Sequence, residues 1–381
     1  MRVTVSPGVL AWARERSGAE AGDLERRFPN LAGWESGEGS PTLKQLESFA
    51  RATHTPIGFL FLDEPPDERV PIPDYRTMGR AGVGRPSADL LDTIFLCQLR
   101  QEWYREFALV TGEGQGDFVG TLNPSTPVPE AAANIRTALR FDTDERGQNW
   151  SEALRLLVDR AEEAGALVMT SGVVGSNTHR KLDPHEFRGF ALVDSVAPLV
   201  FVNGADTKAA QLFTLMHELA HLWLGGAALD DASPAAPPST SIERWCNEVA
   251  AEVLVPLDVV RAEFDAGQPL SSELERLARN FKASTLVVLR RLYDAHFLGN
   301  WDAYRSAYEA ELHRVLEILA ERAGGGGNFY STQPVRVSKR FTRAVITSTL
   351  EGQTLYTDAF QMLGFRSAAT FQQLADHLGV A

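Results

Sequence analysis

Apolar residues recur at helical spacing along most of the chain. Ala88 to Val110, Glu130 to Leu139 and Trp150 to Ala164 each carry apolar residues three or four positions apart, which predicts three helices. Residues 6–62 contain shorter runs of the same kind and predict a string of short helices, the first starting at Ser6-Pro7. The pattern therefore predicts a mostly helical protein.

The middle of the chain changes to short, continuous apolar runs. Residues 166–170, 187–193 and 198–202 are rich in Val, Leu and Phe, which predicts strands. The last two runs lead into an apolar helix, for which Gly225-Gly226 is a stop signal. An exposed strand beside such a helix can hold an extended peptide through its backbone, so these two strands are either a peptide-binding edge or purely structural.

Proline and glycine mark the expected boundaries between parts of the chain. We expect an all-helical domain at 1–64, a proline-rich linker at 65–86, a central domain at 87–300 and a C-terminal helical region at 301–381. Within the central domain, residues 271–293 predict a helix, a turn and a second helix capped by Ser284. Gly324 to Gly327 predicts a hinge, and the helices that follow are expected to end near Gly352, Gly364 and Gly379. The fold class is α+β.

Composition limits the cellular compartment and the classes of binding partner that we expect. The formal net charge of −13 over 381 residues argues against non-specific attraction to nucleic acid or to an anionic membrane. No apolar run approaches the length of a membrane span, and the N-terminus lacks a secretory signal, so we expect a cytoplasmic protein without a membrane partner. Cys97 and Cys246 lie in apolar helical patterns and are expected to be reduced core residues.

The most informative motif is His217-Glu218-x-x-His221 in the apolar helix. Residues four apart lie one helical turn from each other, so His217 and His221 can bind one zinc ion from the same helix face. Glu218 then lies beside the ion, where it can take a proton from a water molecule that attacks a peptide carbonyl. The motif predicts metal-dependent peptide hydrolysis.

A catalytic zinc site needs a third protein ligand besides the two histidines. The next predicted helix carries a stripe of Arg244, Glu248 and Glu252 that is expected to face solvent. Glu243 lies on a different stripe, with Asn247 and then small and apolar residues, which is typical of a face turned towards a site. We therefore predict Glu243 as the third ligand, with Glu248 as the alternative and Asn247 as a residue that orients a ligand or the substrate.

The negative charge that develops on the carbonyl oxygen needs a hydrogen-bond donor in addition to zinc. The candidates are His179, His185, Arg188 and Tyr75, and the sequence does not rank them.

Basic residues in two other places admit more than one interpretation. Arg290 and Arg291 in the second helix of the 271–293 unit could meet phosphates, although such a unit more often serves only for packing. A C-terminal stripe of Arg336, Lys339, Arg340 and Arg343 is expected to be a solvated face, with an acidic partner or nucleic acid as the alternative.

The N-terminal domain resembles the Cro/C1-type helix-turn-helix domains called XRE, which bind operator DNA. The resemblance rests on Leu10-x-Trp12-Ala13-Arg14, Leu24 to Phe28, Trp34-Glu35-x-Gly37, Pro41-Thr42, Leu46-Glu47 and Pro56-x-x-Phe59-Leu60-Phe61. Only Pro29 to Gly33 lie between Phe28 and Trp34, where a recognition helix would need polar side chains to reach base edges. The domain also lacks an excess of basic residues, so a protein-docking role is favoured over DNA binding.

The central domain resembles the ImmA/IrrE metallopeptidase family. The resemblance rests on Phe213-Thr-x-x-His217-Glu218-x-x-His221 and on Glu243-x-x-Cys246-Asn247-x-x-Ala250-Ala251-x-x-Leu254-x-Pro256, and it covers roughly residues 70–300. It implies a zincin-like fold, His217, His221 and Glu243 as zinc ligands, and Glu218 as the catalytic base. The C-terminal Asn328-Phe329-Tyr330 segment also resembles the form of this family that is fused to an XRE domain.

Two functions from different classes follow from these resemblances. In the first, the protein is a zinc endopeptidase that cleaves an XRE-type transcriptional repressor and so switches on stress, mobile-element or toxin-antitoxin genes. In the second, it is a DNA-binding regulator or antitoxin whose metal domain mainly senses or binds a partner.

Overall fold

The computed structural model describes residues 2–19, 21–68, 70–72, 86–113, 116–226, 228–230, 241–321 and 336–380. Tyr75, the Gly324 to Gly327 hinge, the Asn328 to Tyr330 segment and most of the 65–86 linker lie outside these residues. Backbone contacts divide the chain into two compact units, the first formed by Met1–Pro71 and Gly82–Phe95 and the second by Ile72–Ala81 and Leu96–Ala381. In the part of the chain described, no helix is both long and apolar enough to cross a membrane.

The first unit is the predicted string of short helices. It contains α1 (Pro7–Arg16), α2 (Ala21–Arg27), α3 (Leu31–Glu35), α4 (Leu43–Ala52), η1 (Ile57–Phe61) and the start of α5 (Ala88–Thr111). Thr42 caps α4 in a reciprocal capping box with Gln45. The helix α3 has only five residues, and its Leu31 and Trp34 are buried in an aromatic core with Phe28. The apolar side chains of α3, the segment in which the XRE resemblance would place a recognition helix, are therefore used for packing.

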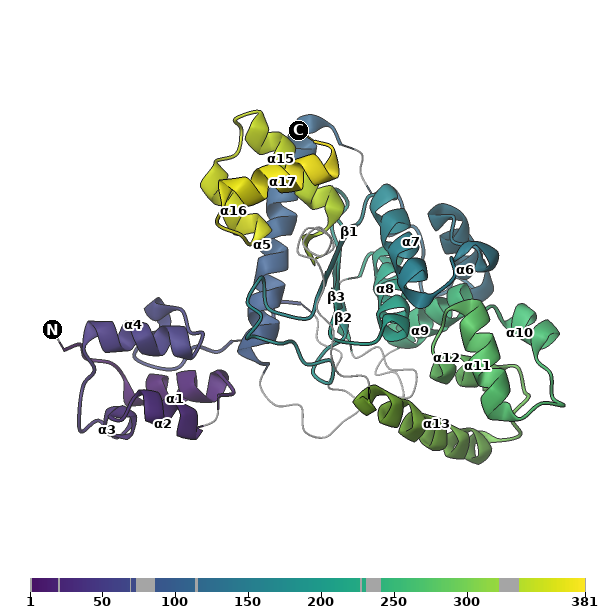
Figure 1. Ribbon diagram of the computed structural model, residues 1–381, viewed down its shortest axis with the longest axis horizontal. Helices are drawn as coiled ribbons and strands as arrows, with labels where there is room; N and C mark the ends of the chain where they lie inside the picture. The colour runs from purple at the N-terminus through teal and green to yellow at the C-terminus, as the bar shows by residue number, and fades with distance from the viewer. Residues whose placement is uncertain are drawn as a thin grey trace. The chain divides into compact units, whose positions relative to one another are not determined.

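The second unit places a small sheet among helices, as the α+β expectation requires (Figure 1). Before the motif helix come α6 (Val128–Leu139), η2 (Thr143–Glu145), α7 (Trp150–Glu163), β1 (Leu167–Ser171), β2 (Gly189–Leu192) and β3 (Leu199–Asn203). The motif helix is α8 (Lys208–Leu224), and β4 (Ala228–Asp230) and α9 (Ser241–Leu254) follow it. The remaining helices are α10 (Leu257–Glu263), α11 (Leu270–Phe281), α12 (Thr285–Asp294), α13 (Trp301–Glu321), α15 (Lys339–Leu350), α16 (Tyr356–Leu363) and α17 (Ala368–Leu378).

The sheet has the order β1-β3-β2-β4, with β1 parallel to β3 and β2 antiparallel to both of its neighbours. The three strands predicted from the apolar runs are confirmed. The strand β4 was not predicted from the sequence. Since β4 pairs with β2, both β2 and β3 are inner strands. Of the two alternatives for these strands, the free peptide-binding edge is therefore contradicted and the structural role remains.

The two faces of the sheet contact different helices. Side chains alternate between faces along a strand, so neighbouring residues of β1 point in opposite directions. Val168 joins the core that contains α8, whereas Met169 contacts Cys97 and Arg100 of α5 on the other face. Figure 1 shows α5 and α8 on opposite sides of the strands. Cys97 and Cys246 are buried, and neither forms a disulfide in the part of the chain that the structure describes.

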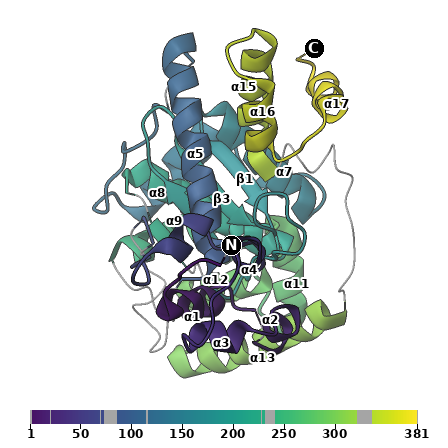
Figure 2. The same cartoon turned by 90° about the vertical axis from the view of Figure 1, so that its left-hand side faces the viewer.

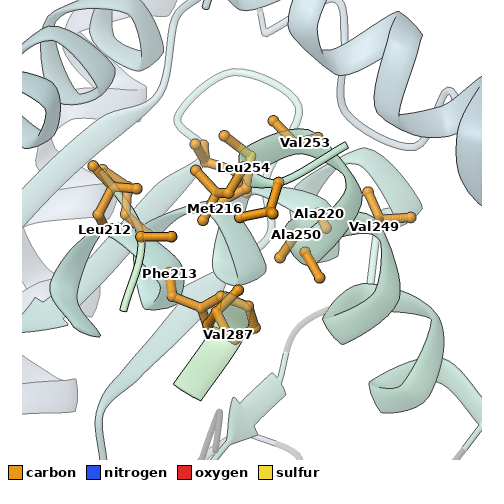
Figure 3. Packing of buried hydrophobic residues seen from close by; sticks show 14 of the residues in the cluster. Leu212, Phe213, Met216, Ala220, Val249, Ala250, Val253, Leu254 and Val287 are labelled. Atoms are coloured by element: carbon orange, nitrogen blue, oxygen red, sulfur yellow. The ribbon is translucent and has the colours of Figure 1, made fainter. Parts of the chain in front are cut away.

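The motif helix α8 is buried on almost every side. Its Leu212, Met216 and Ala220 pack in the same cluster as Val249 and Val253 of α9 (Figure 3). It ends as predicted at Gly225, which adopts the left-handed conformation with φ 72°. Because side chains cover α8 all round, the histidines of the motif are held inside the protein rather than on a surface helix.

The expectation of a solvated basic stripe in the C-terminal region is wrong for Lys339 and Arg340. The Lys339 ammonium lies 2.6 Å from Asp159 Oδ1 of α7, and Arg340 Nε donates to the Tyr104 hydroxyl of α5 over 2.5 Å. Figure 2 shows α15 and α16 alongside α5. The stripe faces acidic and aromatic groups of the same chain, although Arg343 remains exposed. The helices α16 and α17 end at Gly364 and Gly379 as predicted.

The 271–293 unit is present as α11 and α12, with Ser284 accepting a hydrogen bond from the Val287 N–H. Arg291 is only 5 % exposed; it donates to the Val255 carbonyl over 2.9 Å and forms an ion pair with Glu252. It is therefore not available to a phosphate. The same ion pair corrects the prediction that Glu252 faces solvent.

Candidate metal centre

The two histidines of the motif lie together in the interior of α8. His217 is fully buried and His221 is 1 % exposed. Their Nε2 atoms are 3.1 Å apart, because a separation of four residues places both rings on one face of the helix. Thr207 caps the start of α8 and Gly225 ends it, so the motif occupies the regular part of the helix.

The first turn of α9 adds a carboxylate to this pair. Glu243 is 1 % exposed, its Oε2 lies 3.2 Å from His217 Nε2, and its Oε1 lies 3.2 Å from His221 Nε2. In the part of the chain described, no other group of three His, Cys, Asp or Glu residues could hold a metal ion. The structure thus brings together the three side chains that the sequence singles out.

The distances within this cluster fit a zinc ion. Ligand atoms about 2.0–2.1 Å from a tetrahedral zinc lie about 3.3 Å from one another. The two Nε2 atoms are 3.1 Å apart, a different oxygen of Glu243 lies 3.2 Å from each of them, and the ligand atoms of the three residues all lie within 4.8 Å of one another. Two imidazole nitrogens and one carboxylate also form a donor set that zinc accepts, and three protein ligands leave the fourth position open for water or substrate. The residues present therefore fit the ion that the motif implies.

The charge of Glu243 is maintained by its neighbours. Burial by itself would raise the pKa of Glu243, but hydrogen bonds and charge from His217 and His221 outweigh it and hold the pKa well below its usual range. A buried, ionised carboxylate beside two imidazoles is an environment that a divalent cation stabilises.

Glu218 lies on the side of α8 that contacts the sheet. It is fully buried, and its Cγ lies beside the backbone of β2: a Cβ placed on Gly189 would be 3.2 Å from that atom. The carboxylate is adjacent in sequence to His217, so one helix supplies both a metal-binding nitrogen and a proton acceptor. Gly189 was missed by the sequence analysis, although a glycine inside an apolar strand is a recognised sign of close backbone approach.

The other predicted site residues lie elsewhere or at the margin of the site. Asn247 is one turn beyond Glu243 and partly buried, and its Oδ1 is buried without a hydrogen-bond partner among the described residues. Glu248, the alternative ligand, is exposed. His179 and His185 are exposed in the connection between β1 and β2, and Arg188 lies 3.7 Å from Asp206. None of these last three belongs to the cluster.

Three arginines hold the far end of α9, and the sequence analysis singled out only Arg291 among them, for a different role. Arg146 is 1 % exposed and donates to the carbonyls of Val253 and Leu254, and also to that of Phe281. Arg136 and Arg291 donate to the carbonyls of Glu252 and Val255. Guanidinium groups thus satisfy the carbonyls at the negative end of the helix that carries Glu243.

Comparison with known families adds an independent observation. Residues 161–293, from the end of α7 to α12, match the model of peptidase family M78, described as the IrrE N-terminal-like domain. Residues 337–377, which include α15 to α17, match a domain of unknown function, DUF8813. Searches of curated proteins and of solved structures found no match. The first match supports a metallopeptidase domain that acts on protein, and this domain contains the whole cluster.

Proposed function

We propose that this protein is a zinc-dependent endopeptidase that cleaves a protein substrate. The observation that carries the proposal is the buried cluster of His217, His221 and Glu243, with Glu218 next to it on the same helix. The peptidase-family match over residues 161–293 supports the same reaction class.

The residues of the site have two roles in this reaction, metal binding and proton transfer. His217, His221 and Glu243 would hold the ion, which acts as a Lewis acid that activates water and polarises the peptide carbonyl. Glu218 takes the proton of the attacking water as the new C–O bond forms. It then delivers that proton to the leaving amine as the C–N bond breaks.

We further propose that the substrate is an XRE-type transcriptional repressor, so that cleavage switches on stress, mobile-element or toxin-antitoxin genes. This proposal about the substrate rests on the resemblance of the N-terminal and central parts of the chain to XRE and ImmA/IrrE proteins. The short α3, whose Leu31 and Trp34 are buried, favours a docking role for the N-terminal unit over the reading of operator DNA.

The proposal is tested with the purified full chain and the XRE-type repressor encoded nearest to its gene. Zinc-loaded protein should convert the repressor into two fragments of defined mass, and a chelator should prevent this. Glu218→Gln keeps the size of the side chain but removes the proton acceptor, so it should bind zinc and cut at most slowly. Undiminished cleavage by this variant would refute the mechanism. Tight operator binding by a wild-type protein that cuts nothing would instead support the regulatory alternative.

A further inference from the structure

The first residue of β2 leaves no room for a side chain. A Cβ on Gly189 would lie 2.6 Å from Thr214 Cγ2 and 2.8 Å from the Phe201 carbonyl oxygen, both closer than real Cβ atoms approach other atoms. Gly189 is also paired on both sides, with Val202 of β3 and with Asp230 of β4. The strand backbone therefore lies directly against α8 at this point.

The part of α8 that touches Gly189 includes Glu218. Thr214 and Glu218 are one helical turn apart and share the face that lies against β2. The position of a glutamate Cγ determines where its carboxylate can lie, and this Cγ would be 3.2 Å from a Cβ at position 189. The backbone of β2 thus occupies the space into which the Glu218 side chain could otherwise turn.

The metal-binding side chains depend on a different contact. His217 and His221 meet Glu243 of α9, whereas Glu218 meets β2. Two separate neighbours of α8 therefore set the position of the ion and the position of the proton acceptor. A change at Gly189 can disturb the second without removing any ligand of the first.

We propose that Gly189 is a positioning residue for Glu218: because it has no side chain, β2 packs closely enough to hold the carboxylate where it accepts the proton of the attacking water. The methyl group of Thr214 occupies the remaining space between α8 and Gly189. This inference rests on the proposed function, since it assigns the position of the proton acceptor in that reaction.

The test uses acetohydroxamic acid as a probe, because a hydroxamate binds zinc through two oxygens and shares its proton with a nearby carboxylate. Its affinity for the zinc-loaded full chain is measured by calorimetry, and zinc affinity is measured separately by competition with a chelator. Losing a hydrogen bond to a charged group weakens binding by roughly tenfold to a hundredfold, so Gly189→Ala should weaken the hydroxamate by about tenfold. Its zinc affinity should equal that of the wild type.

Two further variants separate positioning from general damage to the sheet. Adding Thr214→Ser to Gly189→Ala removes the methyl group nearest to the new Cβ, so hydroxamate affinity should recover in part. Gly172→Ala is the matched control, because its Cβ would meet the Ala205 backbone nitrogen at 3.0 Å with no contact to Glu218. This control should leave both affinities unchanged. If Gly189→Ala alone does not fold, the double variant becomes the test, and its hydroxamate affinity should still lie below that of the wild type.

The outcomes distinguish this inference from the proposed function. If Glu218→Gln binds the hydroxamate as tightly as the wild type does, the role of Glu218 in the proposed function is wrong. If Glu218→Gln weakens the hydroxamate while Gly189→Ala and the double variant do not, only the positioning role is overturned. Equal losses in Gly189→Ala and Gly172→Ala, or a loss of zinc affinity in Gly189→Ala, would also overturn it.

Discussion

The contact between α7 and α15 should make the stability of the protein depend on pH through one carboxyl group. Glu162, in the last turn of α7, is 8 % exposed. Its Oε1 accepts hydrogen bonds from the Ser338 hydroxyl over 2.6 Å and from the Lys339 N–H over 3.0 Å. Its Oε2 accepts from the Arg340 N–H over 3.3 Å. The carboxyl therefore caps the start of α15 from another helix, and replacing it by Gln keeps its size but removes its titration.

The size of this pH-dependent change in the free energy of unfolding follows from the pKa of Glu162. Burial raises the pKa of Glu162 from its ordinary 4.5 to about 7, against the opposing effect of the Ser338 hydroxyl, the two backbone N–H groups and the nearby Lys339 charge. Between these values the folded protein keeps the proton and the unfolded chain has lost it. The free energy of unfolding therefore falls as pH rises, by about 3 kcal/mol in all from this group. Glu162 lines a cavity of about 570 Å³ together with Asp159 and Arg343, so solvent can exchange the proton.

The assay compares urea unfolding of the wild type and of Glu162→Gln between pH 4.5 and pH 8. The wild type should lose about 3 kcal/mol relative to the variant across this range. Hydrogen exchange at the amides of Lys339 and Arg340 should show the same trend, because these amides bond to the carboxyl. Glu163→Gln is the matched control, since its side chain is 51 % exposed and pairs with Arg140 and Arg160. A stability difference between wild type and Glu162→Gln that does not change with pH would refute the reasoning.

Three further predictions concern the metal centre and the helix that completes it. Glu243→Gln should lose most of its bound zinc, whereas Glu248→Gln should keep it, because Glu248 is an exposed glutamate on the same helix. Zinc content is measured by elemental analysis after dialysis. Full zinc retention in Glu243→Gln would exclude Glu243 as a ligand. Arg146→Met should lower the free energy of unfolding by roughly 3–6 kcal/mol, because three buried carbonyls lose a charged donor; a loss below 1 kcal/mol in urea titrations would contradict this. Zinc at about 1,000 times its Kd should stabilise the fold by about 4 kcal/mol, and a calorimetric melting temperature that a chelator does not lower would argue against a bound ion in the folded state.

Much of the local structure could be predicted because it depends on short-range rules. The apolar spacing around His217 predicts a helix, and Gly225, Gly364 and Gly379 end helices because glycine tolerates the left-handed conformation. The inward position of Glu243 also followed from the residues that share its helix stripe.

The predictions from sequence were wrong where a residue's environment depends on distant parts of the chain. Lys339 and Arg340 have the pattern of a solvated stripe, yet α5 and α7 supply acidic and aromatic partners more than 170 positions away. Glu252 was expected to face solvent, but it pairs with Arg291 of another helix. A helical pattern shows which residues share a face, and it does not show what that face meets.

The sequence by itself singled out the candidate residues of the metal centre: two histidines and a glutamate at helical spacing, and a second glutamate on the inward stripe of a later helix. Spacing within each helix is enough to show which residues share a face, because the geometry of a helical turn is the same in every protein. Only the tertiary structure decided that Glu243 reaches within 3.2 Å of both histidines, that β4 covers the edge of β2, and that Gly189 lies against Glu218. These features depend on how closely separate elements pack, and close packing is set by the shapes of side chains that are distant in the sequence.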